Sequence, residues 1–88
     1  MAGADARGVE ALFARGRLIA IPRRRARRAQ LLAHLAERLF QPGRDYTEQQ
    51  VNEALLTVHE DCASLRRHLV DEGWLARSAD GTRYRRVR

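Results

Sequence analysis

The spacing of apolar residues predicts one long helix in the first half of the chain. Residues 23–40 contain neither glycine nor proline, and apolar side chains recur along one face of them at helical spacing. Pro22 suits the first turn of such a helix, because its ring fixes a helical φ and the missing N–H is not needed there. The Pro42-Gly43 pair then ends the helix.

The pattern before this helix is weaker. Residues 1–8 are small and polar with two glycines, so we expect them to be disordered. The apolar spacing in residues 9–16 fits a short amphipathic turn or helix that Gly16 ends. Residues 18–21 are apolar and precede a proline, which favours a short strand or an extended arm.

A second helix is predicted to begin after Thr47. Thr47 and Gln50 have the spacing of a capping box, in which each side chain bonds the backbone N–H of the other residue. Val51, Leu55 and Val58 then recur at helical spacing and form the buried face.

A third helix follows after a short connection. Asp61 is a suitable N-cap, and the inward positions are Cys62, Leu65 and Leu69. Gly73 is placed to end this helix in a left-handed conformation.

The remaining residues have the pattern of a β-hairpin. Residues 74–77 and 82–87 read as strands, and the four residues between them contain the turn signal Asp80-Gly81. Three helices joined by short connections and followed by a hairpin have the element order of a winged helix-turn-helix. We therefore expect residues 9–88 to form a single, mainly α domain of this class, with a plain three-helix bundle and an ordered tail as the alternative.

Composition narrows the functional class. A chain of 88 residues has room for one small core, which excludes a multidomain enzyme. No stretch is apolar enough to span a bilayer, and we expect no secretory signal. The single cysteine cannot form an intramolecular disulfide, as expected for a cytoplasmic protein.

The positive charge is concentrated in two segments. The formal net charge is +6, and every one of the 17 basic residues is an arginine. Residues 23–28 carry five arginines and no acid, and residues 73–88 carry five arginines with one acid, while the segment between them is mildly acidic. A small basic domain of this kind usually contacts a polyanion or an acidic surface.

Several sequence stretches together resemble one bacterial domain family. They are Gly16 to Pro22, Tyr46 to Asn52, the His59 and Asp61 pair, the Leu-Arg-Arg run within residues 65–77, and Tyr84. The family is a domain of unknown function whose members stand alone or follow an ArsR-type helix-turn-helix regulator domain. The resemblance covers residues 13–86 and implies a winged-helix-like fold associated with transcriptional regulation.

The third helix is the candidate recognition helix. Its outer face carries Ser64 and Arg67, with Arg66 at the flank, and arginine can bind guanine bidentately in the major groove. The alternative is that Arg66 and Arg67 form ordinary surface pairs with Asp71 and Glu72.

The two basic segments supply the candidate phosphate contacts. These are Arg23, Arg24, Arg25, Arg27 and Arg28 in the first segment, and Arg77, Arg83, Arg85 and Arg86 in the second. The alternatives are a solvated basic face for the first segment and a basic edge strand that prevents aggregation for the second.

No residue pattern indicates a metal, a cofactor or catalysis. His59, Cys62 and His68 lie in one region, but their spacing does not suit one metal ion and there is no second cysteine. Glycine-rich phosphate loops and nucleophile elbows are absent from the sequence. We therefore expect a non-enzyme without cofactor.

The sequence supports two functional hypotheses. The first is a transcriptional regulator that contacts duplex DNA, with a homodimer or a partner regulator domain to enlarge its small interface. The second is an adaptor that uses the same scaffold to bind a protein, an RNA or the ribosome, because a fold does not determine a function.

Overall fold

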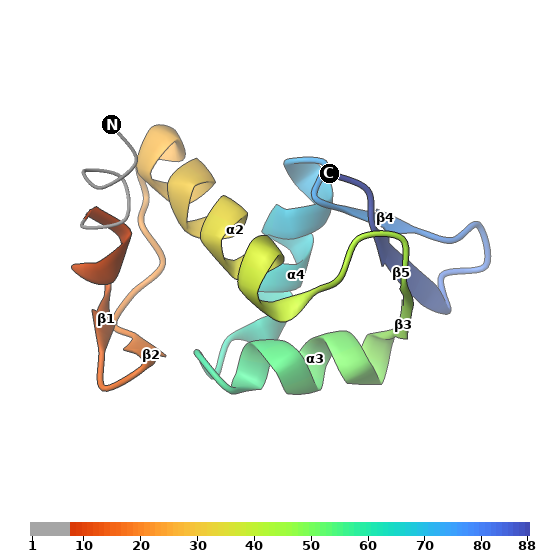
Figure 1. The fold of residues 1–88 in the computed structure, drawn as a ribbon, viewed down its shortest axis with the longest axis horizontal. Helices are drawn as coiled ribbons and strands as arrows, with labels where there is room; N and C mark the ends of the chain where they lie inside the picture. Colours follow the sequence, from red (N-terminus) through yellow and green to blue (C-terminus); the bar gives the residue numbers. More distant parts are fainter. Residues whose placement is uncertain (1–7) are drawn as a thin grey trace.

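The computed structural model describes residues 8–88 and gives a small α/β domain with two antiparallel sheets (Figure 1). Residues 8–10 are helical. The further elements are β1 (Phe13–Ala14), β2 (Arg17–Leu18), α2 (Arg25–Leu39), β3 (Asp45–Thr47), α3 (Glu48–Leu56), α4 (Cys62–Asp71), β4 (Leu75–Arg77) and β5 (Arg83–Arg86).

The long helix is confirmed as α2. It begins at Arg25 and ends at Leu39, close to the bounds that the apolar stripe predicts. Leu31, Leu32 and Leu35 are fully buried on its inner face. Arg24, the N-cap, makes no side-chain capping bond, so burial of this stripe, rather than a cap, holds the helix in place.

The capping box at the start of α3 is also confirmed. The backbone N–H of Gln50 donates to Thr47 Oγ1 at 3.1 Å, and the backbone N–H of Thr47 donates to Gln50 Oε1 at 2.9 Å. Val51 and Leu55 are fully buried, as the spacing predicts, and Val58 is buried just beyond the helix.

Replacing Thr47 by alanine is expected to lower the free energy of unfolding by about 1 kcal/mol, because a first-turn N–H of α3 loses its acceptor. Thr47→Ser keeps the hydroxyl and should retain most of the stability. Urea denaturation followed by circular dichroism measures both variants. Equal losses in the two variants would contradict this role for the hydroxyl.

Both ends of α4 agree with the prediction. Asp61 Oδ1 accepts the backbone N–H of Ser64 at 3.2 Å, and Gly73 has a φ of +78°, the left-handed conformation that ends the helix. Leu65 and Leu69 are fully buried, whereas Cys62 is only partly buried against the core.

The C-terminal hairpin is confirmed as β4 and β5, but the sheet has a third strand that the pattern did not predict. The strand order is β3-β5-β4, with Tyr46 of β3 opposite Tyr84 of β5. β3 has only three residues and runs directly into the cap of α3, so no alternating pattern marks it. The predicted C-terminal hairpin is therefore only part of a larger, three-stranded sheet.

The short helix or turn predicted for residues 9–16 is wrong for its second half. Phe13 pairs with Leu18 across a β1–β2 hairpin whose two turn residues, Arg15 and Gly16, both have positive φ. Such a two-residue turn matches the twist of an antiparallel pair, so a hairpin replaces the helix. The predicted extended arm over residues 18–21 is a strand only at Leu18.

The disorder predicted for residues 1–8 lies outside the described residues, except at Gly8. Gly8 is helical, and its carbonyl accepts a hydrogen bond from Arg27 Nη2 at 2.6 Å. This contact places the described N-terminal end against the start of α2.

One core joins the helices to the three-stranded sheet. In Figure 1 α2 crosses in front of α4, α3 lies below them, and the sheet lies at the opposite end from the β1–β2 hairpin. The largest fully buried side chains come from all of these layers except the hairpin: Leu31, Leu32, Leu35, Phe40, Val51, Leu55, Leu65, Leu69 and Leu75. Within residues 8–88 no helix has the length and apolar character needed to cross a membrane.

Candidate nucleic-acid interface

The outer face of α4 is fixed by the burial of its inner face. Because Leu65 and Leu69 point into the core, Ala63 and Arg67 lie on the exposed side, and Ser64 is partly exposed. The bond between Asp61 and Ser64 holds the first turn of the helix in place and lowers the pKa of the Asp61 carboxyl.

A groove of about 410 Å³ separates α4 from the β4–β5 hairpin. Ala63, Ser64 and Arg67 line it from α4, and Arg77 lines it from β4. Arg77 pairs with Tyr84 across the hairpin, so both side chains lie on the face of the sheet that looks toward α4.

The turn of the hairpin leaves room for the Arg77 side chain. A Cβ on Gly81 would lie only 2.7 Å from Arg77 Nη2, and Gly81 has a φ of +75°. Glycine therefore serves two purposes at this position: it adopts the turn conformation, and it lets the guanidinium lie against the turn backbone.

Arg66 is bound within the fold rather than directed outward. Its Nη1 donates to Asn52 Oδ1, and its Nε lies 3.7 Å from Glu48 Oε1. Tyr84 donates its hydroxyl proton to the same Glu48 oxygen at 2.9 Å. Burial raises the pKa of the Tyr84 hydroxyl, and the bond to Glu48 raises it further. These side chains form the floor of the groove and tie α4 to α3 and β5.

The structure does not contain the alternative pairs of Arg66 and Arg67 with Asp71 and Glu72. Among residues 8–88, Arg66 pairs with Glu48 of α3, and Glu72 pairs with Arg25 of α2 at 3.6 Å. Arg67 has no ion-pair or hydrogen-bond partner in this part of the chain. Its charge is therefore free to meet an external anion.

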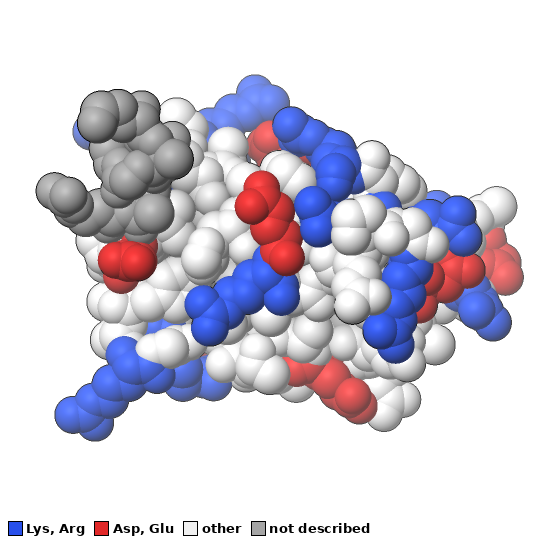
Figure 2. Space-filling model, viewed as in Figure 1, with Lys and Arg blue, Asp and Glu red and all other residues white. Residues whose placement is uncertain are grey.

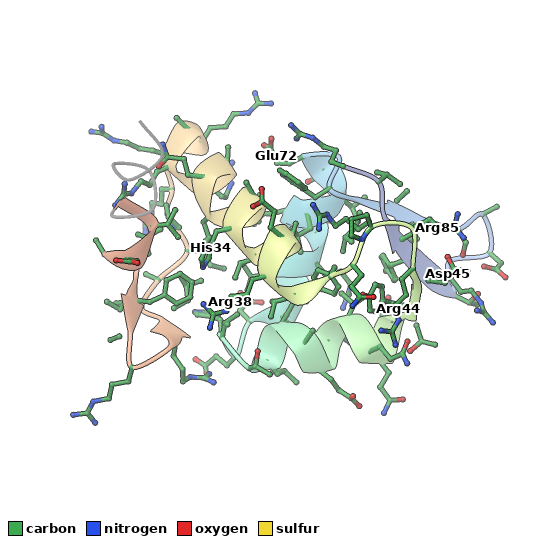
Figure 3. The ribbon with its side chains drawn as sticks, in the orientation of Figure 1. His34, Arg38, Arg44, Asp45, Glu72 and Arg85 are labelled. Atoms are coloured by element: carbon green, nitrogen blue, oxygen red, sulfur yellow. The ribbon has the colours of Figure 1, made fainter. Side chains whose placement is uncertain are left out.

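Arg83 and Arg85 lie on the other face of the sheet, away from the groove. They flank the buried Tyr84 in β5, so strand alternation turns both to solvent. Arg85 Nε donates to Asp45 Oδ1 at 2.7 Å, and this bond lowers the pKa of the Asp45 carboxyl (Figure 3). Part of the charge of the β4–β5 hairpin is thus neutralised by β3, the strand that the sequence pattern did not reveal.

Arg86 serves the fold. Its Nη1 donates to the Phe40 carbonyl at 3.0 Å and its Nε donates to the Arg88 carbonyl at 2.9 Å. Its guanidinium also lies 5.8 Å from the centre of the Trp74 ring. The structure therefore places it between α2 and the C-terminal residues and not at the groove.

The first basic segment lies at the N-terminal end of α2, far from the turn of the β4–β5 hairpin (Figure 1). Arg23, Arg24 and Arg25 are exposed. Arg27 and Arg28 are partly buried and bond the backbone carbonyls of Gly8 and Arg23.

The basic residues are therefore spread over the molecule. Figure 2 shows separate basic groups on one face, with acidic side chains among those over the β4–β5 hairpin. The structure brings Ser64, Arg67 and Arg77 together at one groove and distributes the other candidate contacts along the domain.

The residues considered for metal binding are not gathered into a site. Residues 8–88 contain no group of three or more histidine, cysteine or acidic side chains able to hold a metal ion. His59 Nδ1 accepts the backbone N–H of Asp61 at 2.9 Å, so this histidine helps to form the corner between α3 and α4.

One family model matches the sequence of this domain. It is described as an uncharacterized protein conserved in bacteria (DUF2087), and it matches residues 17–86. The chain belongs to the DUF2087 family. The family resemblance drawn from the sequence motifs is thus confirmed, and the match includes every residue that lines the groove of this DUF2087 domain. Comparison with curated proteins and with solved structures gave no match.

The β4–β5 turn of the DUF2087 domain depends on Asp80. Its Oδ1 accepts bonds from the Ser78 hydroxyl at 2.6 Å and from the backbone N–H and hydroxyl of Thr82 at 3.0 and 2.8 Å. These bonds lower the pKa of Asp80 from 3.8 to about 2, and the bond from Ser78 contributes most.

We expect the Asp80 carboxyl to titrate at about pH 2 by NMR. Because the folded pKa is lowered, the contribution of this carboxylate to stability is present above pH 3.8 and is lost as the pH falls through about 2. Ser78→Ala should move the midpoint back toward 3.8. Ser64, on α4, is not bonded to Asp80, so Ser64→Ala should leave the midpoint unchanged. An unchanged midpoint in Ser78→Ala would contradict the assignment.

Proposed function

We propose that this domain is a winged-helix, DNA-binding protein of the bacterial cytoplasm that acts in transcriptional regulation. The order of elements from α2 to β5, with β5 between β3 and β4, supports this interpretation. So do the short connection between α3 and α4 and the hairpin that directly follows α4. In winged helices, α4 would be the recognition helix and the β4–β5 hairpin the wing.

The observation that carries the proposal is the groove with Arg67 on one side and Arg77 on the other. Ala63 and Ser64 lie beside Arg67 and are small, so the helix backbone can approach a base edge closely. Two exposed arginines across a groove can each bind a phosphate or, from α4, a guanine edge.

The acidic residues of the groove are compatible with this use. Glu48 is bound by Arg66 and by the Tyr84 hydroxyl, so its charge is largely compensated. Asp71 lies at the C-terminal end of α4, one helical turn beyond Arg67. The proposed contact therefore uses the N-terminal half of α4, where the helix dipole favours phosphates.

The first basic segment contributes only if the duplex runs along the domain. The longest dimension of the domain is 38 Å, and the start of α2 and the wing tip lie toward opposite ends of it. One DNA turn is about 34 Å long, so a duplex in this direction could meet both Arg23 to Arg25 and the wing.

Salt-dependent binding to duplex DNA tests the proposal. We expect a fluorescent 20-base-pair duplex of random sequence to bind at 50 mM KCl, as measured by anisotropy. With three phosphate contacts, the affinity should fall about fortyfold between 50 and 200 mM KCl.

A single-stranded RNA of equal length is the control. Absence of duplex binding at 50 mM KCl would refute the proposal. Tighter binding of the RNA than of the duplex would favour an RNA or ribosome adaptor instead.

A further inference from the structure

A second cleft lies at the other end of the domain, between the β1–β2 hairpin and the helices α2 and α3. Its volume is about 350 Å³, near the lower end of the range of small-molecule sites. Phe13 lines it from the hairpin, His34 and Arg38 line it from α2, and Val58 lines it from the end of α3.

The hairpin is held over the helices by backbone bonds. The N–H of Leu18 donates to the Val58 carbonyl at 2.7 Å, and Arg17 Nη1 donates to the Leu56 carbonyl at 3.1 Å. Leu18 is buried, so the hairpin is anchored to the core and its Phe13 forms a fixed wall. The cleft is therefore part of the folded domain.

One wall of the cleft carries two nitrogen donors on successive helical turns. His34 and Arg38 are four residues apart on α2, and Figure 3 shows both directed toward the β1–β2 hairpin. Among residues 8–88, neither side chain has a hydrogen-bond or ion-pair partner. The His34 ring packs edge-to-face against Phe13, at 5.6 Å between centroids.

The other walls are apolar, with one acid. Phe13, Leu35, Leu39 and Val58 supply the apolar surface. Glu10 also lines the cleft and is exposed. A negative charge at the rim disfavours ligands that carry two negative charges, such as phosphate monoesters, more than those that carry one.

We propose that this cleft binds a small organic monocarboxylate, with its carboxylate on Arg38 and His34 and its short apolar group against Phe13 and Leu39. Arginine binds carboxylates through two parallel hydrogen bonds, which gives such a site its orientation. Glu10 and Phe13 precede the residues that match the DUF2087 model, so this site uses a part of the chain outside that match.

Titration of the ¹⁵N-labelled domain with phenylacetate tests the proposal by NMR. We expect saturable shifts at Phe13, His34 and Arg38, with a dissociation constant in the millimolar range. Arg38→Gln should weaken binding at least fivefold. Arg24→Gln, which removes the same charge from an exposed position before α2, should leave binding unchanged, and Glu10→Gln should strengthen it.

Neutral phenylacetamide and phenyl phosphate are the control ligands. Equal binding of phenylacetamide and phenylacetate would refute the carboxylate site, and so would shifts spread over the arginines of the wing. Absence of saturable shifts, or an unchanged affinity in Arg38→Gln, would refute it as well. No nucleic acid is present in this titration, so its outcome is independent of the proposed DNA binding.

Discussion

Replacing Leu65 by alanine is expected to lower the free energy of unfolding by about 3 kcal/mol. Leu65 is fully buried on the inner face of α4. Its truncation removes apolar surface from the core and leaves a cavity, and such substitutions cost about 2–5 kcal/mol. A domain of this length has a total stability of about 4–13 kcal/mol, so the loss is a large share of it.

Leu56→Ala is the matched control for this prediction. Leu56 is 46% exposed at the end of α3, so the same truncation there removes little buried surface. Its expected cost is below about 1 kcal/mol. Urea denaturation monitored by circular dichroism gives both values. Similar losses in the two variants would contradict the conclusion that burial of Leu65 stabilises the domain.

Replacing Arg67 and Arg77 together by alanine is expected to weaken duplex binding at least about a hundredfold at 50 mM KCl. A hydrogen bond to a charged group contributes about 1.5–3 kcal/mol, and the double variant removes one such residue from each side of the groove. The slope of log affinity against log salt should also fall by about 2, because two phosphate contacts are lost.

The matched control removes the same charge from the opposite face of the sheet. Arg83→Ala with Arg85→Ala deletes two arginines of β5 that point away from the groove, one of them paired with Asp45. The expected loss in this variant is less than tenfold, since only long-range attraction changes. Equal losses in the two double variants would mean that net charge, and not the groove, governs binding.

The three main helices could be predicted from the sequence because the signals that mark them are local. The apolar stripe of α2, the Thr47 and Gln50 capping box and the Asp61 cap each lie within a few residues, and each is present in the structure. The left-handed Gly73 is a local signal of the same kind.

The short strands could not be predicted in the same way. β3 has three residues, and its existence depends on pairing with β5, almost forty residues further along the chain. The β1–β2 hairpin turns at Arg15 and Gly16, a pair in which only glycine signals a positive φ. β3 is thus decided by long-range pairing, and the β1–β2 hairpin by a turn whose first residue gives no sequence signal.

The groove was predictable in part. The sequence placed Ser64 and Arg67 on the outer face of α4 and included Arg77 among the candidate contacts. It did not reveal that Arg66 would bond Glu48 and Asn52, because these residues come from a different helix.

NMR of the ¹⁵N-labelled domain with a DNA duplex shows whether the duplex binds at the groove. A 20-base-pair duplex is added at low salt, and the backbone amide shifts are followed residue by residue. We expect the largest shifts at Ala63, Ser64, Arg67 and Arg77, around the groove between α4 and the β4–β5 hairpin. Shifts confined to the outer face of the sheet around Asp45 and Arg85, or no shifts at all, would contradict it.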